Sequence, residues 1–331
     1  MRVLITGGAG FIGSHLSDLL ISLGDEVWVL DNLSTGSLEN IQQLQGNPRF
    51  HFTRQSVLAG GLEEVVSSVD AVVHLAAVVG VRRVMERPLE TIETNVRGTE
   101  AVLKQAAKRK TPVLLASTSE VYGKSSKIRF SEEDDLVLGA PSSPRWSYAY
   151  SKAVDECFAL SYGKERGVPV VIARLFNTVG PRQSSEYGMV LPAFIRQALA
   201  GLPLTVYGDG QQTRCFGYVG DVVKTLARLL RTPQATGQIF NIGSEEEVSM
   251  QELAQRVIRI TGSKSTIVQV PYAQAYGEGF EDMSRRVPSL DKIRSYVGGG
   301  KITTLDEIIR ICLAYEGNLL SSPAGQRAGE S

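Results

Sequence analysis

The chain has 331 residues, and its 35 Lys and Arg residues are balanced by 35 Asp and Glu residues, so its formal net charge is zero. A chain without a positive excess has no overall attraction for nucleic-acid backbones or anionic membranes, and we expect neither as a partner. Hydrophobic residues make up 43% of the chain and charged residues 21%, which is ordinary for a globular protein and argues against disorder.

The cysteines indicate the cellular compartment, and the apolar runs indicate whether the chain is expected to cross a membrane. Cys157, Cys215 and Cys312 are too few and too scattered for a disulfide framework, and they show no metal-ligand spacing. We therefore expect no metal and a reducing, cytoplasmic location. No apolar run approaches the roughly 18 residues that a membrane helix needs. Residues 2–6 already predict a strand, so we expect no signal peptide.

The first half of the chain alternates short apolar runs with longer amphipathic stretches. Strands are predicted at 3–6, 26–30, 71–75, 112–116 and 169–174, and helices at 11–23, from about 62, at 88–109 and at 148–166. Strands that alternate with helices indicate a parallel sheet covered on both faces. We therefore predict an α/β fold with a Rossmann-type, doubly wound parallel sheet that forms a first domain at 1–180.

The pattern changes after Gly180, where Gly and Pro become denser. Helices predicted at about 190–200, 221–231 and 249–261 alternate with short extended pieces, which indicates a smaller α/β substrate-binding lobe at 181–331. Residues 239–242 predict a strand that returns to the first lobe. We therefore expect a segment near 217–245 to cross the boundary.

A glycine-rich turn lies between the first predicted strand and the first predicted helix. Its glycines follow the spacing Gly-x-x-Gly-x-x-Gly, at Gly7, Gly10 and Gly13. Glycine there permits a tight turn and lets a pyrophosphate approach the free N–H groups at the start of the helix. Asp31 ends the next strand, where a carboxylate accepts both ribose hydroxyls of NAD and repels the 2′-phosphate of NADP. No Arg or Lys occurs at 32–39, so we expect NAD as the cofactor.

A second pattern lies on the predicted helix at 148–166. Tyr148 and Lys152 are four residues apart and therefore lie side by side on the helix. A nearby ammonium lowers the pKa of a phenol, so Tyr148 can remove a proton from a sugar hydroxyl. The pair alone is also compatible with an ordinary amphipathic helix, and the glycine turn favours the catalytic interpretation. Tyr150 lies on another face, and we assign it to packing.

Hydroxyl and carboxylate side chains follow the strand before this helix. A hydroxyl at the end of a strand in a parallel sheet faces the binding crevice, so we expect Thr118 to bond the reacting hydroxyl. Ser119 and Glu120 follow it into the same crevice. We count these three with Tyr148 and Lys152 as candidate catalytic residues. A solvated or salt-bridged role for Glu120 stays open.

Taken in chain order, these motifs and several later ones form one set. The set comprises Gly7, Gly10, Gly13, Asp31, His74-Leu75-Ala76-Ala77, Asn95, Thr118, Tyr148, Lys152, Phe176-Asn177, Gly180-Pro181-Arg182, Tyr207-Gly208-Asp209-Gly210, Arg214 and Tyr218-Val219. Over about residues 1–315 the chain thereby resembles the extended short-chain dehydrogenase/reductase family, in its nucleotide-sugar branch.

The resemblance implies a bound NAD, a UDP-sugar or related nucleotide-sugar substrate, and two sets of contacts. The NAD contacts that it implies are Gly7, Gly10, Phe11, Ile12, Gly13, Asp31, Asn32, Ser56, Leu75, Ala76, Ala77, Asn95, Tyr148 and Lys152. The substrate contacts are Asn177, Arg182, Val206, Tyr207, Arg214 and Arg286. Relatives often carry an Asp near the adenine where this chain has Gln55-Ser56, so the backbone and Ser56 are the expected contacts there.

Signals for the subgroup are mixed. Residues 118–123, Thr-Ser-Glu-Val-Tyr-Gly, resemble UDP-glucuronate decarboxylases and also GDP-mannose 4,6-dehydratases. Residues 144–148, Pro-Arg-Trp-Ser-Tyr, and 280–289, with Phe-Glu-Asp and Arg-Val-Pro-Ser, resemble the decarboxylase of bacterial aminoarabinose synthesis. Residues 31–36 are instead similar to UDP-glucose 4-epimerases. The resemblance favours a UDP-glucuronate decarboxylase, with a 4-epimerase of UDP-hexose or UDP-glucuronate as the alternative and a 4,6-dehydratase behind both.

The resemblance also implies roles. Tyr148 would take the proton from the sugar O4, Lys152 would hold the nicotinamide ribose, and a 4-keto sugar would form. Glu120 is the residue that distinguishes a decarboxylase or dehydratase from a plain 4-epimerase, because the epimerase needs no acid or base there. Arg214 can pair with the UDP pyrophosphate, which we favour, or with a hexuronate carboxylate. A non-catalytic NAD-binding sensor would be expected to lose Tyr148 or Lys152. The family's helix pairing further implies a homodimer.

Overall fold

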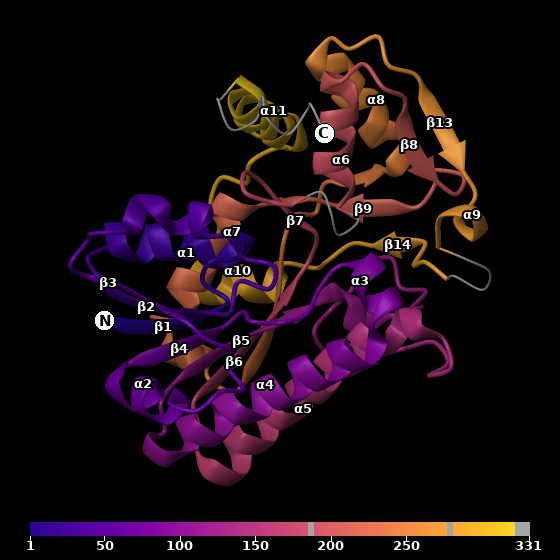
Figure 1. Cartoon of the computed structure of the whole chain (residues 1–331). Helices are drawn as coiled ribbons and strands as arrows, with labels where there is room; N and C mark the ends of the chain where they lie inside the picture. Colours follow the sequence, from indigo (N-terminus) through magenta and orange to yellow (C-terminus); the bar gives the residue numbers. More distant parts are fainter. Residues whose placement is uncertain (185–188, 277–280, 322–331) are drawn as a thin grey trace.

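The computed structural model describes residues 1–184, 189–276 and 281–321. The chain forms two lobes (Figure 1). The larger lobe contains the N-terminus and a broad sheet, and the smaller one is built from later residues. No helix in the described ranges is long and apolar enough to cross a bilayer.

A seven-stranded parallel sheet lies in the middle of the larger lobe. Its order is β11-β6-β5-β4-β1-β2-β3, and every neighbouring pair is parallel. Its strands are β1 (Arg2–Thr6), β2 (Glu26–Asp31), β3 (Phe50–Arg54), β4 (Ala71–His74), β5 (Val113–Thr118), β6 (Val170–Leu175) and β11 (Gln238–Ile242). The order reverses between β4 and β1, which places a crevice at the carboxyl ends of these strands. The predicted doubly wound sheet is confirmed.

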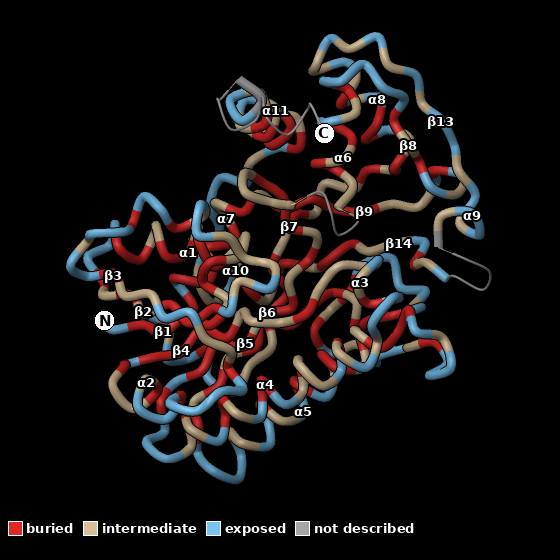
Figure 2. The backbone as a smooth tube through the Cα atoms, in the orientation of Figure 1, coloured by how far each residue is buried: buried red, intermediate tan, exposed pale blue. Residues whose placement is uncertain are grey.

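Helices cover both faces of this sheet because its strands are apolar on both sides. Val3 and Ile5 of β1 pack into a core with one layer of helices, while Leu4 packs into a second core on the opposite face. The buried positions follow the strands through the lobe (Figure 2). The first layer contains α1 (Phe11–Ser22), α7 (Val219–Leu229) and α10 (Asp291–Val297), and the second contains α2 (Leu62–Ser68), α4 (Pro88–Arg109) and α5 (Ser147–Arg166).

The smaller lobe has its own core, formed by side chains such as Phe194, Leu204, Leu253 and Ile308. Its helices are α6 (Val190–Leu199), α8 (Met250–Thr261), α9 (Tyr272–Tyr276) and α11 (Leu305–Ser321). Its strands form a parallel pair, β8 (Leu204–Tyr207) with β13 (Ile267–Val270), and a group of three, β12 (Glu247–Ser249), β9 (Thr213–Cys215) and β14 (Arg285–Arg286).

Short elements connect the lobes and border the crevice. β7 (Thr178–Val179) pairs with β10 (Gly217–Tyr218) between the lobes. The remaining elements are the helix α3 (Val81–Glu86) and the 3-10 turns η1 (Leu38–Leu44), η2 (Ser119–Tyr122), η3 (Pro144–Trp146) and η4 (Pro233–Ala235).

One helix after residue 180 lies in a different lobe from the one that the expected domain boundary gives it. β11 pairs with β6, and α7 packs in the larger lobe, as expected for a returning segment. α10 was expected in the smaller lobe with the rest of 181–331, and that assignment is wrong. Leu290 and Ile293 pack in the core of the larger lobe with Phe240, because α10 lies against β11 and α7.

Candidate active site

The glycine turn joins β1 to α1 in the geometry that its spacing predicts. A Cβ on Gly13 would lie 2.3 Å from the carbonyl oxygen of Gly7 and 2.7 Å from the Cα of Gly8, so only glycine lets the helix approach this closely. Gly7 has a φ of 74°, which favours glycine. No side chain caps the start of α1 at Gly10, so its first N–H groups are available to an anion.

Asp31 lies beside this turn at the carboxyl end of β2. Its Oδ2 accepts a hydrogen bond from the Ala9 N–H at 3.0 Å, and its Oδ1 accepts one from the Leu33 N–H at 2.7 Å. Burial raises the pKa of the Asp31 carboxyl, and these backbone hydrogen bonds act in the opposite direction. An acceptor next to a phosphate-binding turn matches the ribose of a dinucleotide, so the residues present fit NAD.

A cavity of about 1000 Å³ extends from this turn to the smaller lobe. Its lining includes these predicted cofactor contacts: Gly7, Gly10, Phe11, Ile12, Gly13, Asp31, Asn32, Ser56, Leu75, Ala76, Ala77, Tyr148 and Lys152. It also includes Thr118, Ser119, Glu120, Asn177, Val206, Tyr207, Arg214 and Arg286. The two lobes therefore contribute to one site.

Two predicted contacts do not line this cavity. The Asn95 side chain accepts from the Val78 N–H at 2.8 Å and donates to the Ser151 hydroxyl at 3.0 Å, so it connects α4 to segments that border the cavity. Arg182 pairs with Asp18 of α1 at 2.8 Å. In the structure the side chains of both residues are bonded to other protein groups.

Tyr148 and Lys152 both extend from α5 into the cavity. The Lys152 Nζ donates to Asp155 Oδ2 at 2.6 Å. Burial, and then the negative charge of Glu120, raises the pKa of the Tyr148 phenol well above its ordinary value, while a hydrogen bond with Thr118 acts to lower it. We expected Lys152 to lower this pKa. In the structure burial prevails, and Asp155 balances the ammonium charge.

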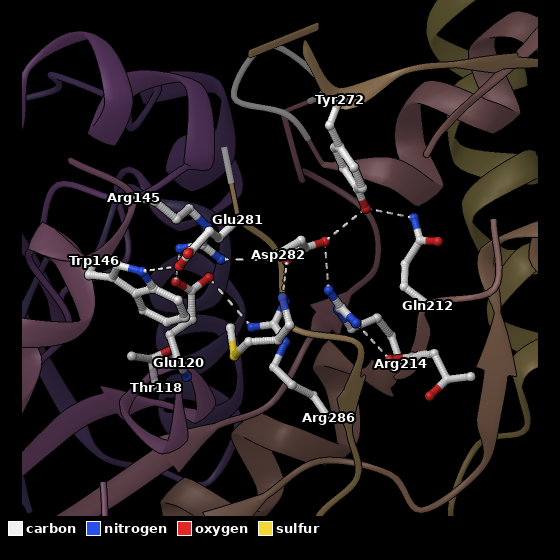
Figure 3. A network of polar contacts seen from close by, with 12 residues as sticks. Thr118, Glu120, Arg145, Trp146, Gln212, Arg214, Tyr272, Glu281, Asp282 and Arg286 are labelled. Carbon is white, nitrogen blue, oxygen red and sulfur yellow. Dashed lines mark hydrogen bonds and ion pairs between the residues drawn. The ribbon is translucent and has the colours of Figure 1, made fainter. Parts of the chain in front are cut away.

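Five charged side chains from both lobes form a network beside Tyr148, the arginine–carboxylate cluster (Figure 3). Glu120 accepts from Arg145 Nη1 at 2.6 Å and lies 3.4 Å from Arg286 Nη1. Asp282 accepts from Arg214 Nη2 at 2.9 Å and lies 3.8 Å from Arg145. Three guanidinium groups thus surround two carboxylates, which leaves one net positive charge for an anionic ligand.

The cluster determines the protonation of its members. Burial alone would raise the pKa of Glu120, but Arg145 and Arg286 outweigh burial and hold that pKa below its usual value. Burial and the neighbouring charge of Arg214 lower the pKa of Arg286 to about 10. Glu120 is therefore a carboxylate at neutral pH, and its predicted position in the crevice is accompanied by two close ion pairs.

Sequence reasoning missed several polar members of this region. Arg145 and Asp282 occur within the quoted decarboxylase-like motifs but were assigned no role. Tyr272 donates to Asp282 at 3.2 Å and accepts from Gln212 at 2.9 Å. Arg285, the residue before Arg286, pairs with Glu247 and does not line the cavity. Phe280 of the second motif lies outside the described residues.

Acidic and aromatic groups flank the cluster. Glu281 accepts from Trp146 Nε1 at 3.1 Å and pairs with Lys124 at 2.6 Å. These contacts join the segment around Asp282 to the larger lobe. Within the described ranges no group of His, Cys, Asp and Glu side chains has the arrangement of a metal site.

Comparisons with known proteins place this site in a known group. Residues 3–243 match the sequence pattern described as "NAD dependent epimerase/dehydratase family". A UDP-N-acetyl-alpha-D-glucosaminuronate decarboxylase of Bacillus cytotoxicus is 47% identical over 296 residues, which are 88% of this chain and 90% of that protein. UDP-glucuronic acid decarboxylase 1 of Danio rerio is 38% identical over 314 residues, 95% of this chain and 72% of that protein.

A solved structure shares the whole fold. The UDP-glucuronic acid 4-epimerase of Bacillus cereus, in complex with UDP-glucuronic acid and NAD, superposes with a TM-score of 0.86 at 30% identity. The match covers 96% of this chain and all of that one.

Proposed function

The chain belongs to the NAD dependent epimerase/dehydratase family, and from that premise we propose that it decarboxylates a UDP-hexuronate through a 4-keto intermediate. The observation that carries the proposal is the ionised Glu120 between Arg145 and Arg286, beside Tyr148 in one cavity. A 4-epimerase needs no carboxylate at this place, whereas a decarboxylase has a use for one.

The relatives agree on the class of substrate and differ at one position of the sugar. The 47% identical relative is named for UDP-N-acetyl-glucosaminuronate and the 38% identical one for UDP-glucuronic acid. Both substrates carry a carboxylate on C5 of a UDP-linked sugar, and they differ in the substituent at C2. The sequence favours UDP-glucuronate, and the more similar relative adds the 2-acetamido sugar as a second substrate to test.

The side chains of the cavity have separate tasks in this reaction. NAD, when bound, accepts a hydride from C4 of the sugar and returns it later. Tyr148 takes the proton from O4, with the Thr118 hydroxyl beside it, and Lys152 holds the cofactor's ribose. The sugar is then a β-keto acid, and the C5–carboxylate bond breaks as its electron pair moves into the carbonyl. The resulting enolate takes up a proton from water at C5, which restores the C4 carbonyl that the returning hydride reduces. Tyr148 returns its proton to O4 at the end of the cycle.

The arginine–carboxylate cluster acts on the charges of the substrate. Arg214 lies where the smaller lobe meets the cavity, and we assign it to the UDP pyrophosphate. Arg286 is the second positively charged residue that we assign to substrate binding. Glu120 is held as an anion close to the reacting carbon, where its repulsion of the substrate carboxylate favours loss of neutral carbon dioxide.

Epimerisation at C4 is the second candidate, because a UDP-glucuronic acid 4-epimerase shares the whole fold with a TM-score of 0.86. In that reaction the keto sugar turns over in the cavity and receives the hydride on its other face. Dehydration between C5 and C6 and a non-catalytic sensor role rank below both. The retained Tyr148 and Lys152 argue against the sensor.

One assay separates these reactions. The purified protein is incubated with UDP-glucuronate, UDP-N-acetylglucosaminuronate and UDP-glucose, and product mass and C4 configuration are determined. We expect the mass of one carbon dioxide to be lost from a hexuronate, without inversion at C4. An inverted product of unchanged mass would replace the decarboxylase with the epimerase.

We propose further that the protein is a cytoplasmic homodimer. α4 packs along α5, and both helices expose apolar side chains, with Leu89 68%, Ile92 41% and Val154 42% accessible. A pair of helices with an exposed apolar face favours association with a second copy. Three free cysteines fit a reducing location.

A further inference from the structure

The candidate catalytic lysine has a buried partner that does not touch the cavity. Lys152 Nζ donates to Asp155 Oδ2 at 2.6 Å, and the two residues are three apart on α5. Only 3% of the Lys152 side chain and none of the Asp155 side chain is accessible. Lys152 lines the cavity and Asp155 does not. Asp155 can therefore influence the site only through Lys152 and through its charge.

The neighbouring carboxylate on the same helix has a different task. Glu156 forms two hydrogen bonds with Arg174, at 2.9 and 2.7 Å, and accepts another from Ser117. The negative charge of Glu156 is therefore balanced by Arg174, a residue of the central sheet. Two adjacent buried carboxylates thus differ in function: Glu156 joins α5 to β6 and β5, while Asp155 faces the reactive lysine.

The other elements around this pair add little charge. From β4, His74 faces Lys152, and burial lowers the pKa of His74 to about 3, so this ring is neutral in the working range. From α4, the polar side chains near α5 are Asn95 and Thr99, which carry no charge. Glu120 of η2 raises the pKa of Tyr148, as Asp155 does, and Arg286 of β14 lowers it.

We propose that Asp155 is a positioning residue, which holds the Lys152 ammonium at the wall of the cavity and places a buried negative charge near Tyr148. The inference rests on the proposed roles of Tyr148 and Lys152. The charge of Asp155 is one of the influences that raise the pKa of Tyr148, so the loss of this charge lowers that pKa.

The consequence is a shift of the acidic limb of the pH profile. Tyr148 must lose its proton to act as a base, and this sets the acidic limb. Asp155→Asn retains an oxygen acceptor for the ammonium but removes the charge. We expect the acidic limb to move to lower pH by roughly one unit.

Glu156→Gln is the matched control, one residue away on the same helix. It breaks the bond to Arg174, so we expect a lower unfolding temperature and an acidic limb that does not move. If Asp155→Asn reduces turnover equally at every pH and the acidic limb stays in place, Asp155 is only structural and the proposal is wrong. Asp155→Ser, which leaves room for water, takes its place if the Asn variant does not fold.

A second measurement does not depend on turnover. The ultraviolet absorbance of tyrosinate is titrated in the NAD-loaded protein and in its Tyr148→Phe variant, and the difference reports Tyr148 alone. The same two titrations are then repeated with the Asp155→Asn substitution added to each protein. A lower tyrosinate midpoint supports the proposal even if no hexuronate is decarboxylated, which would overturn only the proposed function. An unchanged midpoint overturns the proposal.

Discussion

At the scale of single residues, the charge of Glu120 is the property on which the proposed decarboxylation depends. Arg145 holds this carboxylate from η3, the turn before α5, and Arg286 holds it from the smaller lobe. Both arginines lower its pKa against the effect of burial. An anion fixed in this way remains charged when a second carboxylate, that of the substrate, arrives beside it.

Glu120→Gln tests this role. The amide keeps the shape of the side chain and loses the charge, so we expect carbon dioxide release to fall roughly 100-fold, as when a placed electrostatic group is removed. Release of carbon dioxide is measured directly. Glu281→Gln, whose carboxylate lies outside the cavity lining, serves as the control and should retain activity. Equal rates of carbon dioxide release in both variants would contradict the role assigned to Glu120.

Tyr148→Phe tests the proposed base. Loss of the phenol oxygen removes the group that takes the O4 proton, so we expect turnover to fall by about 100- to 10,000-fold. Bound NAD and the unfolding temperature should change little. Tyr150→Phe is the comparison variant, because the Tyr150 hydroxyl donates to the Gly139 carbonyl at 2.8 Å outside the cavity. It should cost about 1 kcal/mol of stability and no activity.

The residues that could be predicted are those whose partners are close in sequence. The spacing of Gly7 to Gly13 and the pair Tyr148 and Lys152 are local patterns. The arginine–carboxylate cluster was missed as a unit because Arg145, Arg214 and Asp282 come from three distant segments. Only the fold brings such groups together. The effect of burial, which raises the pKa of Tyr148, could not be predicted because burial is invisible in a local pattern.

At the scale of elements, the approach of α1 to β1 creates the dinucleotide turn. The first strand is buried on both faces, and the helix packs against it at a distance that excludes a side chain at Gly13. The order of the sheet then places this turn beside the ends of β4 and β5, which carry His74 and Thr118. The cofactor and the catalytic hydroxyl therefore share one edge of the sheet.

Gly13→Ala tests the turn. The added Cβ would meet the backbone of Gly7 and Gly8 at 2.3 and 2.7 Å, so the turn must open. We expect NAD affinity to fall by at least about tenfold, which corresponds to ~1.4 kcal/mol. Calorimetric titration with NAD measures this affinity. Gly60→Ala, where a Cβ meets nothing within 4 Å, should bind NAD like the unaltered protein. Unchanged affinity in Gly13→Ala would contradict the assigned binding site.

Elements with a strong local pattern could be predicted, and those defined by packing could not. The central strands are apolar runs bounded by turns, and the helix predicted at 88–109 begins and ends as α4 does. β3 was not predicted, because its sequence, Phe-His-Phe-Thr-Arg, is half polar at the edge of the sheet. α10 was assigned to the wrong lobe, since its contact with β11 joins residues far apart in the chain.

At the scale of the whole molecule, zero net charge is compatible with an anionic substrate because the cations are gathered where they are needed. The cavity receives Arg145, Arg214 and Arg286, while other charged side chains form exposed pairs outside its lining, such as Arg97 with Glu93. Exposed pairs contribute little to stability. The uneven placement of charge could not be derived from composition, which counts charges and does not locate them.

Val154→Glu tests the proposed homodimer. A charge in the exposed apolar face of α5 must be buried without a partner if two copies associate, so we expect the variant to sediment as a monomer. Ile128→Glu, at a side chain that is 68% exposed away from α4 and α5, should remain a dimer. If the unaltered chain itself sediments as a monomer, the homodimer proposal is wrong.

The place of β11 has a consequence for synthesis on the ribosome. β11 pairs with β6 at the edge of the sheet and is the last of its seven strands to be translated. Until Ile242 has emerged, the nascent chain carries β6 as an open edge, with apolar side chains such as Ile172 on a backbone that can pair with another chain. The whole segment between β6 and β11 must therefore be made before the nascent sheet is closed to aggregation.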